Sequence, residues 1–174
     1  MHSASTLQPT PTFSVYPRCS EPVNRRRYAG PVESESGFEV LDHVADTGFR
    51  CWGPTYEQCL LAAGRAFLAL AVETESVAAR DERLYEIEGE DPAERLVDWL
   101  NDLLFTIDAN LFAPREVVAV DERAPGRWVA RVVGEGPRDP ARHPWKLIIK
   151  GATYHELDVS ERNGRWEAQV ILDV

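Results

Sequence analysis

From Gly37 onward, the pattern of apolar and polar positions has the period of a helix in some segments and the period of a strand in others. The first helical stretch follows Thr55, which forms a capping box with Gln58 and is therefore the expected N-cap. Its apolar positions recur three and four residues apart and form one stripe: Leu60, Ala63, Phe67, Leu70 and Ala71. This pattern predicts an amphipathic helix.

A second helical stretch occupies residues 91–110. Asp91 is its expected N-cap, Pro92 fits the first helical position, and Glu94 completes a box-like pattern. We expect Trp99 to extend the apolar stripe and to pack in the core. The stripe itself is Leu96, Leu100, Leu103, Leu104 and Ile107.

The strand signals lie around these helices. They predict strands within residues 37–42, 48–53, 83–89, 115–122, 127–135, 146–160 and 165–174. The sequence RAPG at 123–126 predicts one hairpin connection, and Asn163-Gly164 predicts another. Strands and helices that do not alternate strictly favour an α+β fold, with two amphipathic helices packed on a mainly antiparallel sheet.

Two segments lack such a period. Residues 1–36 are rich in Ser, Pro, Thr and Glu, which predicts a disordered N-terminal tail ahead of a single domain at 37–174. The segment GPRDPARHP at 136–144 is expected to be a loop, with His143 exposed to solvent.

The charge of the chain narrows the function. Lys and Arg number 19 against 29 Asp and Glu, so the net charge is -10. Such a surface repels phosphate backbones, and we therefore expect no direct nucleic-acid binding. It suits a basic protein partner, a bound cation or simple solubility.

Cysteine usage and hydropathy indicate the compartment. The three cysteines are an odd number without a C-x-x-C motif, so neither a disulfide framework nor a cysteine zinc site is expected. No apolar run is long enough to span a bilayer, and the N-terminus has no apolar signal core. We expect a cytoplasmic protein that does not associate with membranes.

The strongest candidate for a site is divided between the two ends of the domain. Asp46 follows the first predicted strand, and Asp173 and Val174 close the last one. If these strands are neighbours, two carboxylates and a main-chain oxygen could hold a hard divalent cation. Alternatively, Asp46 accepts main-chain hydrogen bonds in a turn and Asp173 is an exposed strand end.

Three further residues are candidates for a function. His43 is either a structural residue before a turn or a ligand. Lys150 and His155 lie in IKGATYHELDV, where a regular strand would place Lys150 and Tyr154 on one face and His155 on the other. The sequence contains no G-x-S-x-G, Walker A, H-E-x-x-H or EF-hand motif, so no catalytic residue is assigned.

Several of these segments together resemble the archease family. They are LDHVADTGFRCWG, PTYEQCLLAAGRAFLAL, DWLNDLLFTIDANLFAPREVVAV, IKGATYHELDV and WEAQVILDV. They occur in the family's order and with compatible spacing over residues 37–174, and the tail lies outside the resemblance.

The resemblance implies a specific function. Archeases are accessory proteins that activate RtcB-type RNA ligases, promoting guanylylation and multiple turnover of the ligase in tRNA splicing and RNA repair. They bind a divalent metal through the residues that match Asp46, Asp173 and Val174, which favours a metal site here. Calcium is the expected ion, and magnesium and manganese are alternatives. Lys150 matches a lysine of the family's C-terminal element.

Two other functions stay open at this point. The chain could itself be a metal-dependent phosphohydrolase or nucleotide-binding enzyme. Its metal ligands, base and phosphate-binding group would then be Asp46, Asp173, His43 and Lys150. It could also be a metal-stabilised interaction module with chaperone-like activity. The absence of a nucleophile motif favours an accessory protein over an enzyme.

Overall fold

A computed structural model of the chain describes residues 36–42 and 47–174. The tail expected for residues 1–36 therefore lies outside the described part, apart from Ser36, and so do His43 and Asp46. The elements follow in the order β1 (Gly37–Asp42), β2 (Thr47–Gly53), α1 (Tyr56–Ala71), the 3-10 helix η1 (Thr74–Ser76), β3 (Asp81–Ile87), α2 (Pro92–Asp108), β4 (Ala113–Ala124), β5 (Arg127–Glu135), β6 (Gly151–Ala152), β7 (Asp158–Arg162) and β8 (Arg165–Asp173).

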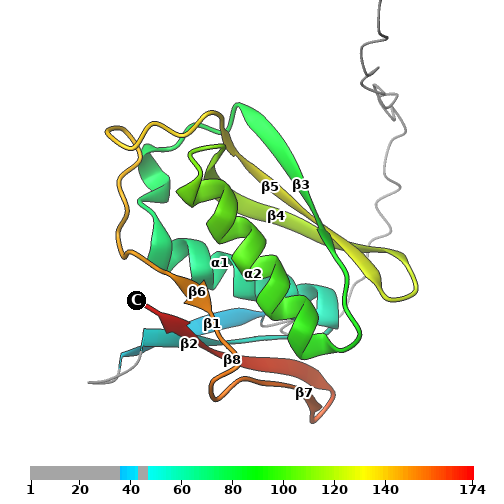
Figure 1. Cartoon of the computed structure of the whole chain (residues 1–174). Coiled ribbons are helices and arrows are strands. Elements are labelled where there is room, and N and C mark those ends of the chain that lie inside the picture. Colours follow the sequence, from blue (N-terminus) through cyan, green and yellow to red (C-terminus); the bar gives the residue numbers. More distant parts are fainter. Residues whose placement is uncertain (1–35, 43–46) are drawn as a thin grey trace, which may run out of the picture. The chain divides into compact units, whose positions relative to one another are not determined.

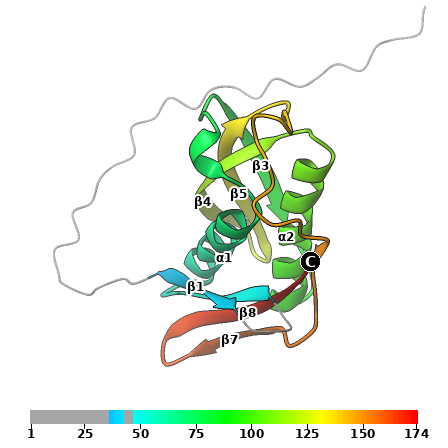
Figure 2. The ribbon, with the colours of Figure 1, turned by 90° about the vertical axis from the view of Figure 1, so that its left-hand side faces the viewer.

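The strands of the described part form two sheets. A five-stranded sheet has the order β1-β2-β8-β6, with β7 also paired to β8, and a three-stranded sheet has the order β3-β5-β4. Every one of these pairings is antiparallel. Helix α1 contacts β2 and β4, and α2 contacts β3 and β6, so the helices lie between the sheets (Figures 1 and 2).

This architecture confirms the predicted α+β class but divides the expected sheet in two. The apolar surface of α1 explains the difference, because it is wider than the predicted stripe. Its buried residues are Tyr56, Cys59, Leu60, Ala62, Ala63, Gly64, Ala66, Phe67, Leu68 and Ala71. A helix buried on so much of its circumference needs covering from two sides.

The helix starts are as predicted. Thr55 is the N-cap of α1, and its hydroxyl accepts a hydrogen bond from the main-chain N–H of Gln58 at 3.3 Å. Asp91 caps α2 through its Oδ1, which accepts from the N–H groups of Ala93 and Glu94 at 2.8 and 2.9 Å. The Glu94 carboxylate accepts from the N–H of Glu90, which lies one position before the cap.

The two helices approach closely at Gly64 of α1. A Cβ atom on Gly64 would lie 2.3 Å from the ring of Trp99 on α2, which leaves no room for a side chain there. Trp99 is 1% exposed and belongs to the main hydrophobic cluster, as the sequence predicted. Glycine therefore makes room for the indole that fills the space between the helices.

The strand predicted at 146–160 is wrong over most of its length, because only Gly151–Ala152 and Asp158–Arg162 are strands. Before β6, the N–H of Lys146 donates to the carbonyl of Ala71 at the end of α1, which draws this segment away from β8. Between β6 and β7 the chain turns, and Glu156 adopts a positive φ of 49°. Both short strands then pair with β8.

His143 was expected in solvent and is instead 1% exposed. Its Nδ1 accepts from the N–H of Asp139 at 3.2 Å, so the ring proton lies on Nε2 and is donated to Glu135 Oε1 at 2.7 Å. Arg142 donates to the same carboxylate oxygen at 2.9 Å. Burial alone would raise the pKa of Glu135, but the hydrogen bonds from His143 and from the N–H of Ala78 lower it below its usual value.

We expect His143→Ala to lower the free energy of unfolding by about 1–3 kcal/mol, because it empties a buried site and removes a donor from Glu135. Urea unfolding monitored by circular dichroism measures the change. His155→Ala is the control, since His155 is exposed and such substitutions usually change stability by under ~0.5 kcal/mol. Equal losses for the two variants would mean that the His143–Glu135 pair does not hold the loop.

Candidate functional site

The candidate site lies where β2 begins and β8 ends. The register of these strands places Thr47 opposite Leu172, the residue before Asp173. On the other side of β8, Gly151 of β6 lies opposite Asp173. Asp173 and Val174 are thus positioned by strands on both sides and remain exposed.

Lys150 is directed to this end of β8. Its ammonium group donates to the main-chain oxygen of Val174 at 2.8 Å and lies 4.0 Å from Asp173 Oδ1. The main-chain N–H of Lys150 donates to the carbonyl of Asp173 at 2.7 Å. The sequence singled out Lys150 as a possible functional residue, and the structure brings it together with Asp173 and Val174.

A shallow hollow of about 250 Å³ lies beside these residues. His155 lines it, as do two residues that the sequence analysis did not single out, Thr47 and Thr153. Thr153 donates through its hydroxyl to the carbonyl of Ile171 at 3.1 Å, and the N–H of His155 donates back to that hydroxyl at 3.3 Å. Because the chain turns after β6, His155 reaches the same hollow as Asp173. The position of Thr47 directly after Asp46 was the available signal in the sequence.

The donor atoms at this end of β8 are hard oxygens: the carboxylate of Asp173, the main-chain oxygen of Val174 and the nearby threonine hydroxyls. Such atoms suit calcium, magnesium or manganese. In residues 36–42 and 47–174, no group of three or more His, Cys, Asp or Glu side chains could hold a metal ion. The remaining predicted contributors, Asp46 and His43, lie outside these residues.

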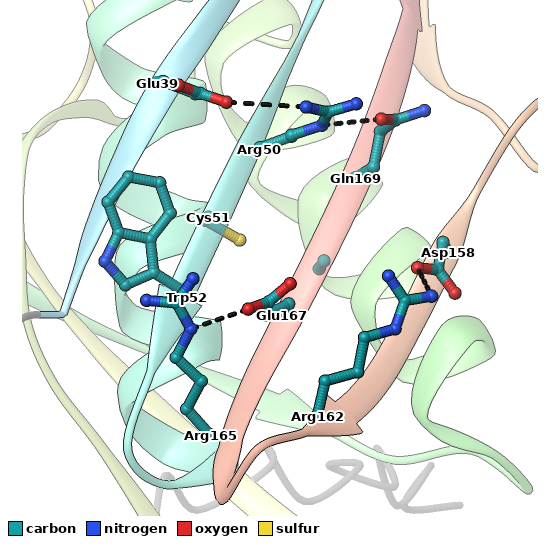
Figure 3. Close-up of a pocket in the computed structure, with 10 residues that line it drawn as sticks. Glu39, Arg50, Cys51, Trp52, Asp158, Arg162, Arg165, Glu167 and Gln169 are labelled. Carbon is teal, nitrogen blue, oxygen red and sulfur yellow. Dashed lines mark hydrogen bonds and ion pairs between the residues drawn. The ribbon is translucent and has the colours of Figure 1, made fainter.

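A larger hollow, of about 480 Å³, lies on the face of the five-stranded sheet that points away from the helices. Arg50 donates to Gln169 at 2.8 Å, Arg165 to Glu167 at 2.6 Å and Arg162 to Asp158 at 2.6 Å (Figure 3). Because each guanidinium is already bound to a neighbouring strand's residue or to its own strand, this hollow offers no free cationic group. Its side chains form a ladder of polar contacts across an exposed sheet face.

No helix within the described ranges is long and apolar enough to cross a membrane.

Comparison with known proteins adds evidence independent of this geometry. Residues 38–174 match the model of the Archease protein family (MTH1598/TM1083). The chain is similar to the protein archease of Methanopyrus kandleri, with 36% identity over 140 residues that make up 79% of this chain and 99% of the relative. The protein archease of Ictalurus punctatus is 31% identical over 79% of this chain and 85% of its own length.

Solved structures agree with the fold. The solution structure of Methanobacterium thermoautotrophicum protein 1598 superposes with a TM-score of 0.64 at 32% identity, covering 79% of this chain and 99% of that protein. A crystal structure described as an archease and possible chaperone, from Thermotoga maritima, gives a TM-score of 0.54 at 19% identity and supports the fold alone. Family model, relatives and architecture agree over the same residues, and the chain belongs to the archease family.

Proposed function

We propose that this protein binds a divalent cation at the end of β8 and activates an RtcB-type RNA ligase, promoting its guanylylation and repeated turnover in tRNA splicing or RNA repair. Family membership supports the ligase as the partner. The accessory role is also consistent with the sequence, which contains none of the nucleophile motifs sought.

The observation that carries the metal site is the pairing of Thr47 with Leu172. Asp46 precedes the first of these residues in the sequence and Asp173 follows the second, so an antiparallel register favours a site shared by the two carboxylates. The main-chain oxygen of Val174 would complete it. A calcium ion is the proposed occupant, and magnesium or manganese would suit the same oxygens.

Lys150 has a defined part in this proposal. Its ammonium group fixes the main-chain oxygen of Val174 and stands near Asp173, where it partly neutralises the carboxylate. A bound cation would bring a stronger positive charge to the same edge. Lys150 would then serve to orient Val174 rather than to balance Asp173. His155 lines the same hollow and would limit the space around the ion.

The function is tested by adding a sub-stoichiometric amount of the protein to the RtcB-type ligase of the same organism, with GTP and a divalent metal, and measuring the ligase–GMP adduct. We expect guanylylation to accelerate at least ~10-fold, and Asp173→Asn to lose most of the effect.

Asp121→Asn is the matched control, because Asp121 is an exposed carboxylate on β4 of the other sheet. It should stimulate like wild type. An unchanged ligase rate would reject the activator function. GTP hydrolysis without ligase would instead support an enzyme. If neither stimulation nor hydrolysis is observed, the chaperone-like interaction module is the remaining function.

A further inference from the structure

One face of α2 carries a stripe that the described elements leave largely uncovered, with Asn101 half-buried against β6 and the other members exposed. Asp98, Asn101, Asp102 and Phe105 are spaced three and four residues apart, which places them on one side of the helix. We call these four residues the α2 stripe. The opposite side is buried, whereas Phe105 is 62% exposed. In Figure 1, α2 lies in front of α1.

A second exposed aromatic side chain belongs to the same surface. Asn101 exchanges hydrogen bonds with the main chain of Ala152, which ties the segment after β6 to the stripe. Tyr154 follows in this segment and is 61% exposed. Partial burial raises the pKa of Tyr154, and the charges of Asp98 and Glu94 raise it further.

Acidic side chains, and no basic ones, line a hollow beside the stripe. A hollow of about 400 Å³ between β3 and α2 is lined by Glu86, Glu88, Asp98 and Asp102. Glu88 pairs with Arg127 at 3.4 Å. Within the described residues, Glu86, Asp98 and Asp102 take part in no ion pair and no side-chain hydrogen bond, in contrast to the paired carboxylates of Figure 3.

This arrangement is unfavourable for the isolated domain. Asp98 and Asp102 are four positions apart on one helix, where like charges repel. Burial and the charge of Asp98 raise the pKa of Asp102, so its ionised form is disfavoured. Neither carboxylate forms an ion pair within the described part, and a cationic group from outside would relieve the repulsion.

The aromatic side chains decide which cation fits. A guanidinium group can pair with a carboxylate and stack on an aromatic ring at the same time, which a bare metal ion cannot do. No group of three or more acidic, His or Cys side chains in the described ranges converges as a metal site would require. RNA is disfavoured because carboxylates repel its phosphates.

We propose that the α2 stripe, together with Tyr154, is a docking surface for a protein partner that presents arginine side chains. Asp98, Asp102 and Phe105 do not line the hollow at the end of β8, whereas Tyr154 stands between Thr153 and His155, which do. The binding experiment with the ligase rests on the proposed function, because that function names the RtcB-type ligase as the partner.

The first experiment measures the affinity of the ligase for three variants. Asp98→Asn combined with Asp102→Asn should weaken binding at least ~10-fold at low salt, and the difference should shrink as salt rises. Phe105→Ala should weaken binding by about fivefold with little dependence on salt. Glu73→Gln combined with Glu75→Gln removes the same charge from two exposed positions, the N-cap and the middle residue of η1, and should bind within about twofold of wild type.

Melting temperatures separate docking from folding. The Asp98→Asn/Asp102→Asn variant should melt at or slightly above wild type, because a repulsion is removed, and it should keep the calcium-dependent shift. Wild-type affinity in this variant would overturn the docking surface. Binding that persists without stimulated guanylylation would contradict the proposed function alone.

The second experiment needs no ligase. A short peptide of alternating arginine and glycine is titrated into isotope-labelled protein, and amide chemical shifts are followed by NMR. We expect the largest changes at residues 98–105, with little change at these residues on adding calcium alone. The proposal would be overturned if the peptide shifts other residues, shifts none, or shifts these residues no more than calcium does. The test remains valid even if wild type does not bind the ligase.

Discussion

In calcium, Asp173→Asn should melt below wild type, and in chelator it should melt level with wild type or above it. A cation held only by the folded state stabilises that state by about 2.7 kcal/mol at a hundredfold excess over Kd. The variant loses this gain. Without metal it also loses repulsion from the second carboxylate proposed for the site. The exposed contact with Lys150 at 4.0 Å contributes under ~1 kcal/mol and does not reverse the order.

Asp46→Asn should show the same reversal, with a melting temperature below wild type in calcium and equal to or above wild type in chelator. The double variant should change the melting temperature little further, because both substitutions disrupt one site. Thermal melts of these proteins in calcium and in chelator test this prediction. Asp121→Asn is the control, and its melting temperature should keep the same order relative to wild type in both conditions. Equal destabilisation of Asp46→Asn in both conditions would identify Asp46 as an ordinary turn carboxylate.

The second large effect concerns the core. Trp99→Ala should lower the free energy of unfolding by about 3–5 kcal/mol, because it removes a fully buried indole and leaves a cavity between the helices. The cavity cannot be filled by Gly64, which has no side chain and sits against the indole ring. Denaturant titration measures the loss, and Trp99→Phe should lose less, which keeps the test informative if the alanine variant does not fold.

Phe105→Ala provides the matched control on the same helix. Its side chain is 62% exposed, so we expect a change in stability under ~0.5 kcal/mol. Similar losses at positions 99 and 105 would mean that the packing of the indole against Gly64 does not determine the stability of this region.

Local signals in the sequence predicted the starts of both helices and the hairpin turns. The caps at Thr55 and Asp91 were identifiable because a capping side chain bonds to main-chain groups only two or three residues away. The turn at Asn163-Gly164 was equally local, and both residues adopt the positive φ that such a turn needs.

Features that depend on distant partners were not predictable in the same way. Alternation of apolar residues indicates which side of a strand is buried but not which strand lies beside it, so the division into two sheets was missed. His143 was placed in solvent because its neighbours are polar. Its actual partner, Glu135, lies across the loop, and no periodic signal connects the two.

The candidate site was predictable only in part. A family pattern, rather than any period in the chain, favoured its residues. The structure places Lys150, Asp173 and Val174 together, and His155 beside them. Thr47 and Thr153 were missed because a hydroxyl residue in a strand is too common to attract notice. Asp46 and His43 stay predictions.

The pairing of β2 with β8 also bears on how the protein is made. These strands come from opposite ends of the described chain, so β2 is paired only with β1 until β8 has been synthesised. Both helices and the three-stranded sheet are complete well before that point. Of the described elements, β8 is therefore the last to join the sheet during translation, and a chain interrupted before β8 cannot form the proposed metal site. A ribosome-stalled fragment would carry the α2 stripe without the site that is proposed to activate the ligase.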